Sequence, residues 1–239
     1  MPDMVTDSQC SCEFRDLGLL EYTRALALQQ ETLAAKLADP ALPDRVLFVQ
    51  HPPVYTLGRR GGRENLVVSE AFLAAKGIEI VQTDRGGNIT YHGPGQAVLY
   101  PVVDLERSRL GVPEFVSGME EIMKRTCAQF DVPADRDERN HGLWVGDKKI
   151  GSVGISIKKG VSIHGLALNV NPDLAPFTWI NPCGLANQAM SSIALENGMD
   201  QQSLDRPPHD ADKQMMDKVR DCFVHYFSEV FERNINRTP

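Results

Sequence analysis

The sequence predicts a fold of the α+β class. Strand-like runs cluster in the middle of the chain, and helical patterns surround them. With 239 residues, 42% of them hydrophobic, the chain can bury a substantial core. No internal repeat or low-complexity linker marks a boundary, so residues 1–239 are expected to form one domain, with residues 1–11 flexible.

The first half of the chain predicts two helices and two strands. Leucines and Tyr22 recur at near-helical spacing over residues 17–38, which predicts a long amphipathic helix that ends before Pro40. A shorter helix is expected over residues 69–76, closed by Gly77. Two apolar runs are typical of buried strands, residues 46–50 and 78–81.

The second half predicts a strand, a hairpin and two more helices. These elements are a strand at 97–104, a helix at 113–130, a hairpin of 148–157 with 161–170 that turns at Lys158, Lys159 and Gly160, and a helix at 211–231 with Asp210 as its N-cap. A surface loop, residues 201–209, is expected before that last helix.

Composition and charge argue against several classes of function. A net charge of -7 is unsuited to general nucleic-acid binding, which relies on Lys and Arg to neutralise phosphates. Apolar runs such as residues 98–103 are far too short to span a bilayer, so no membrane partner is expected. The polar N-terminus lacks the basic-then-apolar order of a secretory signal, so we expect the protein in the cytoplasm.

The cysteines point to a reduced compartment and not to a metal site. Five cysteines are an odd number, and their spacing shows no metal-ligand repeat. Cys10 and Cys12 form a CxC pair, but no second Cys or His pair accompanies them. No bound metal is therefore expected.

The densest group of special residues is the segment 85–96, RGGNITYHGPGQ. Its four glycines would let the backbone approach a ligand closely and leave amides free to bind it. A turn-rich hairpin whose glycines serve geometry alone is the alternative, but so dense a cluster favours a binding wall. The spacing matches neither a P-loop nor a dinucleotide-binding motif, so phosphate binding by those two routes is not supported.

Cys183 differs from the other cysteines in its setting. Cys127 and Cys222 fall within predicted amphipathic helices, where a buried and inert thiol is expected. Cys183 stands in the loop-like sequence Asn-Pro-Cys-Gly (181–184), after a strand-rich region, where a thiol can be presented at a cleft. Either Cys183 is a nucleophile or it is a loop cysteine without a role.

A thiol nucleophile needs a group that favours the thiolate, since free cysteine titrates near pH ~8.5. In the strand 148–157, Lys149 alternates onto one face with four apolar positions, Gly151, Val153, Ile155 and Ile157. Burial on such a face lowers the pKa of a lysine, which makes it a base or a strong electrostatic partner for a thiolate. If the strand begins one residue later, Lys149 is instead a surface lysine at the end of the hairpin.

Two histidines are further candidates. Single histidines such as His92 and His164 are more often hydrogen-bonded core or cleft residues than catalysts. His164 precedes Gly165, and a glycine in a strand lets a ligand or a second backbone come close. An apolar slot beside Gly165 would suit an acyl chain.

Four motifs together resemble the lipoyl(octanoyl) transferases. The motifs are RGGNITYHGPGQ (85–96), KIGSVGI (149–155), HGLALNVN (164–171) and NPCG (181–184), and they occur in the order of that family. The resemblance covers residues 46–193, most of the chain. It implies an α/β fold in which a mixed β-sheet is flanked by helices, similar to the catalytic domains of biotin and lipoate protein ligases.

The resemblance implies roles for particular residues of one acyltransferase catalytic domain. The nucleophile maps onto Cys183, and the lysine that lowers the pKa of the nucleophile maps onto Lys149. The substrate-contact segments of the family map onto three of the motifs, at Arg85, Gly86, Gly87, Asn88, Ile89, Thr90, Tyr91, His92, Ser152, Val153, Gly154, Gly165, Leu166 and Ala167.

The resemblance also implies the reaction, the first step of protein lipoylation. An octanoyl group passes from the phosphopantetheine of acyl carrier protein to Cys183 as a thioester, and then to a lysine of a lipoyl domain as an amide. The implied acceptors are the E2 subunits of 2-oxoacid dehydrogenases and the glycine cleavage H protein. No cofactor is expected, because thioester exchange is nearly isoergic and thioester to amide runs downhill. Arg59, Arg60 and Arg63 are expected to help dock the acidic carrier protein.

Two other functions compete with this one. An ATP-dependent lipoate or biotin ligase would share the fold but activate a free acid as an adenylate, and it would not need Cys183. A non-catalytic module would only bind acyl chains or lipoyl domains. A requirement for ATP and free octanoate would identify the ligase, whereas a Cys183→Ser protein that binds acceptor without turnover would favour the transferase over the module.

Overall fold

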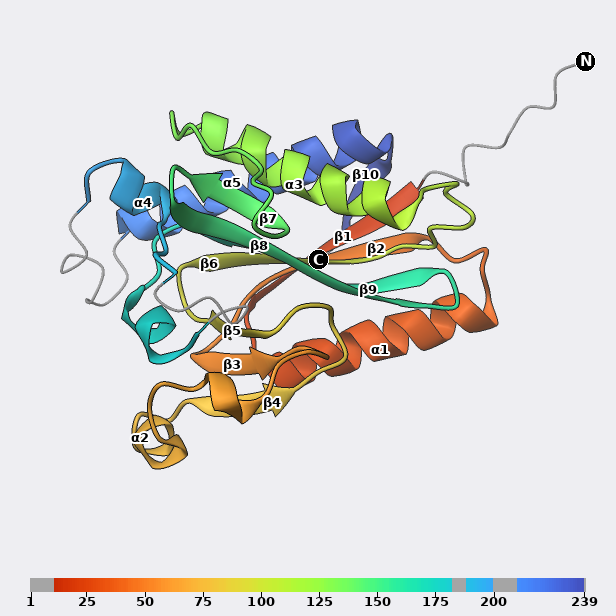
Figure 1. The fold of residues 1–239 in the computed structure, drawn as a ribbon. Helices are drawn as coiled ribbons and strands as arrows, with labels where there is room; N and C mark the ends of the chain where they lie inside the picture. The colour runs from red at the N-terminus through yellow and green to blue at the C-terminus, as the bar shows by residue number, and fades with distance from the viewer. Residues whose placement is uncertain (1–10, 182–187, 200–209, 239) are drawn as a thin grey trace, which may run out of the picture.

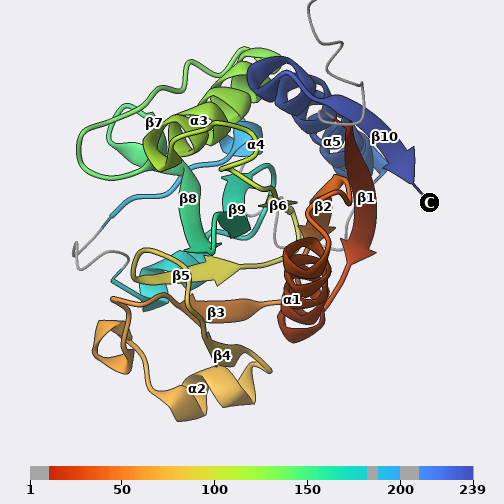
Figure 2. The same cartoon turned by 90° about the vertical axis from the view of Figure 1, so that its right-hand side faces the viewer.

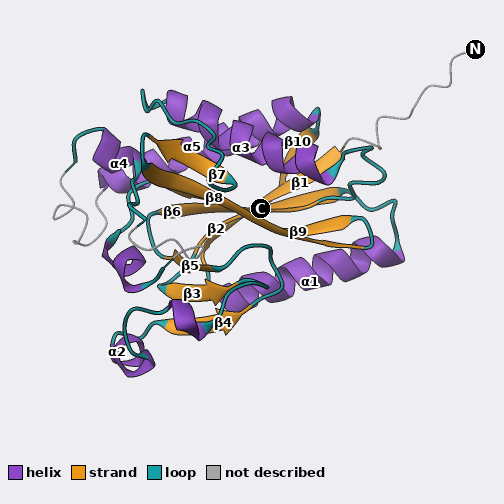
Figure 3. Cartoon of the chain, viewed as in Figure 1, coloured by secondary structure: helices purple, strands orange, loops and turns teal. Residues whose placement is uncertain are grey.

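The computed structural model describes residues 11–181, 188–199 and 210–238, and within them it contains a large and a small β-sheet (Figures 1 and 3). In spatial order, the seven-stranded sheet consists of β10 (Asn234–Thr238), β1 (Ser11–Leu19), β2 (Asp44–Gln50), β6 (Gln96–Val102), β9 (Val161–Asn169), β8 (Lys148–Lys158) and β7 (Gly142–Val145). The three-stranded sheet consists of β4 (Glu79–Gln82), β3 (Val54–Leu57) and β5 (Ile89–His92). Strand β1 pairs in parallel with β10 and β2, and the pairs from β2 to β7 are antiparallel, so the large sheet is mixed.

Helices cover both faces of the large sheet (Figures 1 and 2). The α-helices of the described residues are α1 (Tyr22–Ala38), α2 (Glu70–Ala75), α3 (Val112–Ala128), α4 (Ile193–Glu196) and α5 (Asp210–Phe231), and two short 3-10 helices are η2 (Arg63–Asn65) and η3 (Ala175–Trp179). Helices α3 and α5 pack on one face, and α1 with the small sheet lies on the other. The expected α/β class, a mixed sheet flanked by helices, is confirmed.

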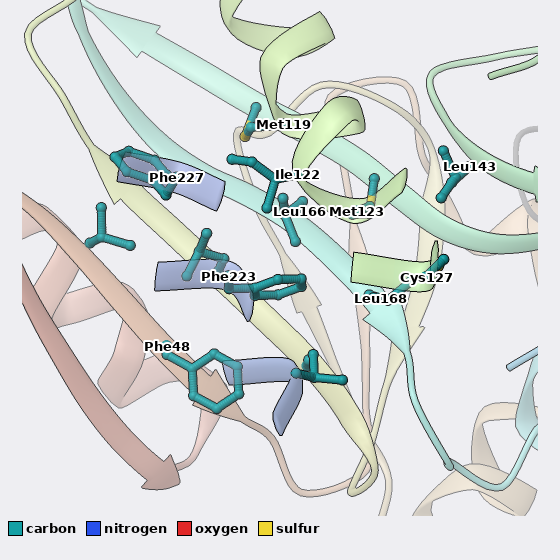
Figure 4. Close-up of a cluster of buried hydrophobic side chains, with 14 of the residues drawn as sticks. Phe48, Met119, Ile122, Met123, Cys127, Leu143, Leu166, Leu168, Phe223 and Phe227 are labelled. Atoms are coloured by element: carbon teal, nitrogen blue, oxygen red, sulfur yellow. The ribbon is translucent and has the colours of Figure 1, made fainter. Parts of the chain in front are cut away.

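The main core lies between the large sheet and the helices α3 and α5 (Figure 4). Large side chains from all of these elements meet there, among them Phe48, Leu166 and Leu168 of the sheet, Met119, Ile122 and Met123 of α3, and Phe223 and Phe227 of α5. Burying each such side chain contributes about 1.5–3 kcal/mol. This core fixes strands β8 and β9, whose opposite face borders the site described below.

The β8–β9 hairpin confirms the turn that the sequence predicts. Lys158 pairs with Val161, and the two residues between them, Lys159 and Gly160, have φ angles of +47° and +81°. Positive φ at both central positions is the geometry of a two-residue turn whose twist matches the strands. The helices expected around residues 69–76, 113–130 and 211–231 are also present, with ends shifted by one or two residues.

The predicted helix over residues 17–38 was wrong at its start. Residues 17–19 belong to β1, and α1 begins only at Tyr22. Cys12 and Phe14 of β1 are buried, and their strand is hydrogen-bonded on both sides, to β2 and β10. These long-range pairings outweigh the helical spacing of the leucines, because strand pairing depends on neighbours that a local pattern does not contain.

Three further expectations concern the strand at 78–81, the N-terminal residues and the loop at 201–209. Strand β4, expected to be buried, is half-exposed because it forms an edge of the small sheet. Residues 1–11 were expected to be flexible: residues 1–10 lie outside the described residues, and for Ser11 the expectation was wrong, because this residue begins β1 and pairs with β10. The loop expected at 201–209 also lies outside the described residues. No helix in the described ranges is long and apolar enough to cross a membrane.

Candidate active site

A cavity of about 560 Å³ lies among β8, β9, β5, the start of α1 and the loop that precedes β5. This volume is within the range of small-molecule sites. Nearly all the site residues expected from sequence line it: Arg85, Gly86, Gly87, Asn88, Ile89, Thr90, His92, Lys149, Ser152, Val153, Gly154, Gly165, Leu166 and Ala167. Cys183 lies outside the described residues, since it falls within 182–187.

The loop at residues 84–88, here called the glycine-rich loop, lies against the open edge of β8. Strand β7 pairs with β8 only as far as Ser152, so the backbone beyond it can bind another partner. The amide of Gly86 donates to the carbonyl of Ile155 at 2.8 Å. A Cβ on Gly154 would lie 3.1 Å from the Gly86 carbonyl oxygen. The absence of a side chain at Gly154 therefore lets the loop backbone approach the strand.

Arg85 holds the glycine-rich loop to the small sheet. Its side chain is buried, and Nη2 donates to the carbonyl and the hydroxyl of Thr56 at 2.6 and 2.8 Å. Nη1 donates to the carbonyl of Gly86 at 3.0 Å. Arg85 thus fixes the loop and also places a buried positive charge in the wall of the cavity.

A bulge in β8 determines where Lys149 points. Leu143 pairs with Gly151 and Trp144 pairs with Lys149, so Ile150 is an extra residue in the ladder. Ile150 belongs to the main core, and a Cβ on Gly151 would meet α3 at 2.6 Å, whereas Lys149 lines the cavity. The expected common face for Lys149 and Gly151 was therefore wrong, because the bulge shifts the alternation by one residue.

Lys149 is buried, at 6% exposure, which excludes the alternative of a surface lysine. Its Nζ donates to the carbonyl oxygen of His141 at 3.0 Å and to Oδ1 of Asn140, and it lies 5.3 Å from the ring centre of Trp144. The backbone of Lys149 is held as well, because its amide donates to the carbonyl of Ala189 at 2.9 Å. The ammonium is thus positioned by acceptors and an aromatic face.

A chain of buried hydrogen bonds connects His92 with the backbone of Lys149. Nδ1 of His92 donates to Oε1 of Gln96 at 2.6 Å, and Nε2 of Gln96 donates to Oδ1 of Asn169 at 2.9 Å. The Asn169 amide then donates to the carbonyl of Ser191, whose own N–H donates to the carbonyl of Lys149 at 2.9 Å. The chain runs from β5 through β6, β9 and Ser191 to β8, so it connects the wall at β5 to the strand that carries the lysine.

His92 and His51 are held neutral. Burial, with His51 nearby, lowers the pKa of His92 to about 3, and burial lowers the pKa of His51 to about 4. His51 Nδ1 donates to the carbonyl of Leu20 at 2.7 Å, so its Nε2 accepts from the Tyr100 hydroxyl at 2.8 Å. Both histidines are therefore neutral, buried and hydrogen-bonded at neutral pH, and His92 lines the cavity as a hydrogen-bonded cleft residue, as expected for it.

His164 is also hydrogen-bonded, and its backbone is strained. Its φ is +59°, and its amide donates to Oε1 of Gln29 at 2.7 Å. Nε2 donates to Oδ1 of Asp84 at 2.8 Å, which leaves Nδ1 to accept from the Tyr22 hydroxyl at 3.5 Å. Burial lowers the pKa of His164, although Asp84 offsets part of this effect. The neighbouring Gly165 has no room for a side chain, since a Cβ would lie 2.0 Å from the Leu99 carbonyl oxygen.

Tyr91 is the expected site residue that lies outside this cavity. It alternates with Thr90 and His92 on β5, so its side chain points to the opposite face of the small sheet. Its ring packs against Tyr55 and Phe177, with ring centres 5.5 and 5.3 Å away. The segment 85–92 is therefore not a uniform binding wall.

Several cavity residues carry no sequence signal that predicts them. Tyr22 belongs to the apolar stripe of α1, and Asn140 and His141 stand in a charged loop where such residues are common.

The buried thiol of Cys127, whose pKa is raised to about 12 by burial, matches the inert state expected for it, whereas Cys222 is only half-buried. Among the described residues, no group of three or more His, Cys, Asp or Glu side chains is arranged to hold a metal ion.

The arginine cluster expected to dock a partner lies beside the glycine-rich loop. The amides of Arg59 and Arg60 donate to the carbonyls of Arg85 and Gly87 at 2.9 and 3.1 Å. Both side chains are exposed, and Arg60 lines the cavity. Arg63 forms an exposed ion pair with Glu70 at 2.8 Å, which reduces its charge available to a partner.

The family model of the lipoyl protein ligase A/B catalytic domain matches residues 21–223, which include all of the described cavity. The chain belongs to this family. Relatives named octanoyltransferase include one from Desulfotalea psychrophila, 46% identical over 213 residues (88% of this chain, 93% of the relative), and one from Alkaliphilus metalliredigens, 40% identical over 226 residues (93% and 96%). The protein is thus an acyltransferase of the lipoyl protein ligase A/B family.

Solved structures show the same fold. The chain superposes on lipoate-protein ligase A bound with ATP with a TM-score of 0.70 at 15% identity, covering 96% of this chain and 90% of that one. A bi-partite lipoate protein ligase from Thermoplasma acidophilum gives a TM-score of 0.69 at 16% identity, covering 96% and 87%. This likeness confirms the expected relation to the lipoate ligase fold.

Proposed function

We propose that the protein transfers an octanoyl group from octanoyl-acyl carrier protein to a lysine of lipoyl domains, through a thioester on Cys183. The observation that carries this proposal is the position of Lys149, a buried lysine in the wall of a partly apolar cavity. The relatives named octanoyltransferase, 40% and 46% identical over most of their length, support the octanoyl group as the substrate.

The cavity suits a medium-length acyl chain. Val98 and Ala167 give it an apolar lining on the face of the large sheet that is opposite the main core. Ala167 pairs with Val98 on one side and with Ser152 on the other. The side chains of Val98, Ala167 and Ser152 therefore form a row on the same face of the sheet. An acyl chain bound along this row would be shielded from water, while its carbonyl carbon would lie near the polar lining residues Lys149 and Asn140.

The described flanks of the segment 182–187 support Cys183 as the nucleophile. Gln188 lines the cavity, and Ala189 binds the amide of Lys149 directly. On the other side, the amide of Asn181 donates to the carbonyl of Asn65 at 2.8 Å. Because Ala189 is bound to the backbone of Lys149, we propose that the Cys183 thiol comes within reach of the Lys149 ammonium, which would stabilise the thiolate.

The two half-reactions balance with Lys149 as the only acid and base. The Cys183 thiolate attacks the donor thioester, the pantetheine sulfur leaves as a thiolate, and Lys149 gives it a proton. The neutral Lys149 then takes a proton from the acceptor amine as the amine attacks the Cys183 thioester. The Cys183 thiolate leaves, which restores the starting pair of thiolate and ammonium without a nucleotide or other cofactor.

Two protein partners follow from this reaction. The donor is acyl carrier protein, and we propose that the exposed Arg59 and Arg60 beside the cavity attract its acidic surface. The acceptors are lipoyl domains of 2-oxoacid dehydrogenase E2 subunits and of the glycine cleavage H protein. We place the reaction in the cytoplasm, where the carrier and the acceptors would meet the enzyme.

The proposal is tested by intact mass spectrometry of the protein after incubation with octanoyl-acyl carrier protein and no acceptor. An octanoyl adduct that peptide mapping assigns to Cys183, and that is discharged by an unmodified lipoyl domain without ATP, is the expected result. Cys183→Ser should form no adduct, while Cys127→Ser, which changes a buried thiol, should still form it. Turnover only with ATP and free octanoate would instead identify a lipoate-protein ligase.

A further inference from the structure

Glu120 is a buried carboxylate on the face of α3 that packs toward β7. Its residue exposure is 6%, unusual for a charged side chain in the middle of a helix. One oxygen, Oε2, faces Nε of Arg136 at 3.3 Å. The other, Oε1, accepts from the backbone amide of Gly142 at 2.9 Å and from Nδ1 of His141 at 3.3 Å. The buried charge is therefore compensated, and half of its bonding capacity is directed at one short turn.

That turn, residues 140–142, lies directly over the side chain of Lys149. A Cβ on Gly142 would lie 2.8 Å from Cε of Lys149 and 2.3 Å from the Gly151 carbonyl oxygen, and the φ of Gly142 is +134°. Only glycine allows this approach, because any other residue would collide with the strand and adopt a disfavoured backbone geometry. The close approach brings the His141 carbonyl and the Asn140 side chain to Nζ of Lys149.

Two acceptors on one turn determine the direction of the remaining Nζ position. When two hydrogens of a tetrahedral nitrogen are bound to Asn140 and His141, the third position has a fixed direction, whether it is an N–H in the ammonium or a lone pair in the amine. Lys149 could then exchange a proton with the substrate along that direction without first losing the conformational freedom of its four-carbon side chain. The acceptors thus orient Lys149 as well as stabilising its charge.

We infer that Asn140 and Glu120 are positioning residues for Lys149: Glu120 anchors the turn 140–142, and the turn directs Nζ through Asn140 and the His141 carbonyl. This inference rests on the proposed function, in which Lys149 stabilises the Cys183 thiolate and exchanges the protons. Both residues act through Lys149 in this inference, since Glu120 accepts from the Gly142 amide of the turn and Asn140 accepts from Nζ. Their loss should therefore weaken the chemical steps and leave substrate binding intact.

The test compares Asn140→Ala, Glu120→Ala and Glu120→Gln in the full-length protein. The first readout is the pH dependence of Cys183 alkylation by iodoacetamide, followed by mass spectrometry, which measures the thiolate fraction. In Asn140→Ala and Glu120→Ala the midpoint should move up toward that of a free cysteine, near pH ~8.5. Glu120→Gln keeps an acceptor for the Gly142 amide and should recover part of the wild-type profile.

The second readout is steady-state octanoyl transfer. Losing one hydrogen bond to a charged group should lower kcat on the order of 10- to 100-fold, with KM for the carrier unchanged. The matched control is Glu121→Ala, the next residue on α3. Glu121 also binds Arg136, at 2.9 Å, but it makes no hydrogen bond to the turn. A merely structural role of the Arg136 ion pairs would change both variants alike.

The outcomes separate this inference from the proposed function. A wild-type thiol midpoint and kcat in Asn140→Ala would overturn the inference, and so would equal effects of Glu120→Ala and Glu121→Ala. If the wild-type protein forms no octanoyl adduct on Cys183, the proposed function itself fails. Should Glu120→Ala not fold, Asn140→Ala still decides, because Asn140 lies half-exposed in a turn and its replacement leaves the core unchanged.

Discussion

His164 and Asp84 join the central strand β9 to the glycine-rich loop, through a contact of 2.8 Å between Nε2 and Oδ1. Asp84 also binds Nζ of Lys158, at 2.7 Å. One carboxylate therefore connects both strands of the β8–β9 hairpin to the loop that covers them. The cavity is held in shape by this connection on one side and by the hydrogen bonds of Arg85 on the other.

Asp84→Asn should destabilise the protein at neutral pH but not in acid. Burial alone would raise the pKa of Asp84, but the hydrogen bonds from Lys158 and His164 outweigh it and lower the pKa to about 2. The carboxylate therefore adds stability above its ordinary pKa of 3.8, and this contribution is lost as the pH falls toward 2. Since the side chain is 39% exposed, we expect a difference of only about 1 kcal/mol at pH 7 in urea unfolding.

The control for Asp84→Asn is Asp147→Asn, which changes an exposed carboxylate in the turn between β7 and β8. It should leave the free energy of unfolding unchanged at both pH values. A deficit of Asp84→Asn that is as large at pH 2.5 as at pH 7 would contradict the role of the ionised carboxylate.

His51 should make the protein less stable as the pH falls below 6.5. Because burial lowers the pKa of His51 to about 4, the unfolded chain binds a proton between pH 6.5 and 4 that the folded protein does not. His51→Gln should reduce the pH slope of the unfolding free energy there by up to about 1.4 kcal/mol per pH unit. Urea unfolding at pH 7, 6 and 5 measures the slope. Equal slopes in His51→Gln and wild type would refute the prediction.

Lys149→Arg should separate the two half-reactions. Arginine keeps the positive charge that favours the thiolate but cannot give up its proton. The acyl-enzyme should still form, because the pantetheine thiolate can take its proton from water once it has left. Discharge of the acyl-enzyme by a lipoyl domain needs a base for the attacking amine and should slow by about 100-fold or more. Single-turnover chase of the preloaded enzyme measures this step. Lys148→Arg, at the neighbouring exposed position, is the control, and full discharge by Lys149→Arg would exclude a role as base.

Arg60→Glu should weaken recognition of the carrier protein. Arg60 is exposed and lines the cavity, so reversing its charge should raise KM for octanoyl-acyl carrier protein severalfold at low salt, and less at high salt. Arg237→Glu changes an exposed arginine in β10, at the opposite edge of the large sheet, and serves as the control. An unchanged KM for Arg60→Glu at low salt would remove Arg60 from the docking surface.

Tyr91→Phe should leave both kcat and KM unchanged. The ring of Tyr91 packs with Tyr55 and Phe177 on the face of the small sheet opposite Thr90 and His92, although Tyr91 stands in the middle of the motif at residues 85–96. Steady-state kinetics with the carrier protein measure both constants. Asn88→Ala, at a cavity-lining position in the same motif, provides the comparison and should raise KM. A raised KM in Tyr91→Phe would show that the substrate reaches the other face of β5.

Local patterns in the sequence determined much of this protein. The turn at Lys159 and Gly160 is specified by two residues, and helices such as α3 follow from an apolar stripe and a glycine-proline start. The four motifs identified the family by resemblance, and with it most of the residues that line the cavity. Such features are local, so a sequence contains all the information that they require.

Only the tertiary structure decided the arrangement around Lys149. Its face depends on a bulge at Ile150, its acceptors come from a turn that Glu120 of α3 anchors, and its backbone is held by Ala189. Likewise, β1 replaced the start of a helix because β2 and β10 pair with it. Each of these results depends on groups far apart in the chain, and burial and hydrogen bonding act on spatial neighbours, which a pattern along the sequence does not identify.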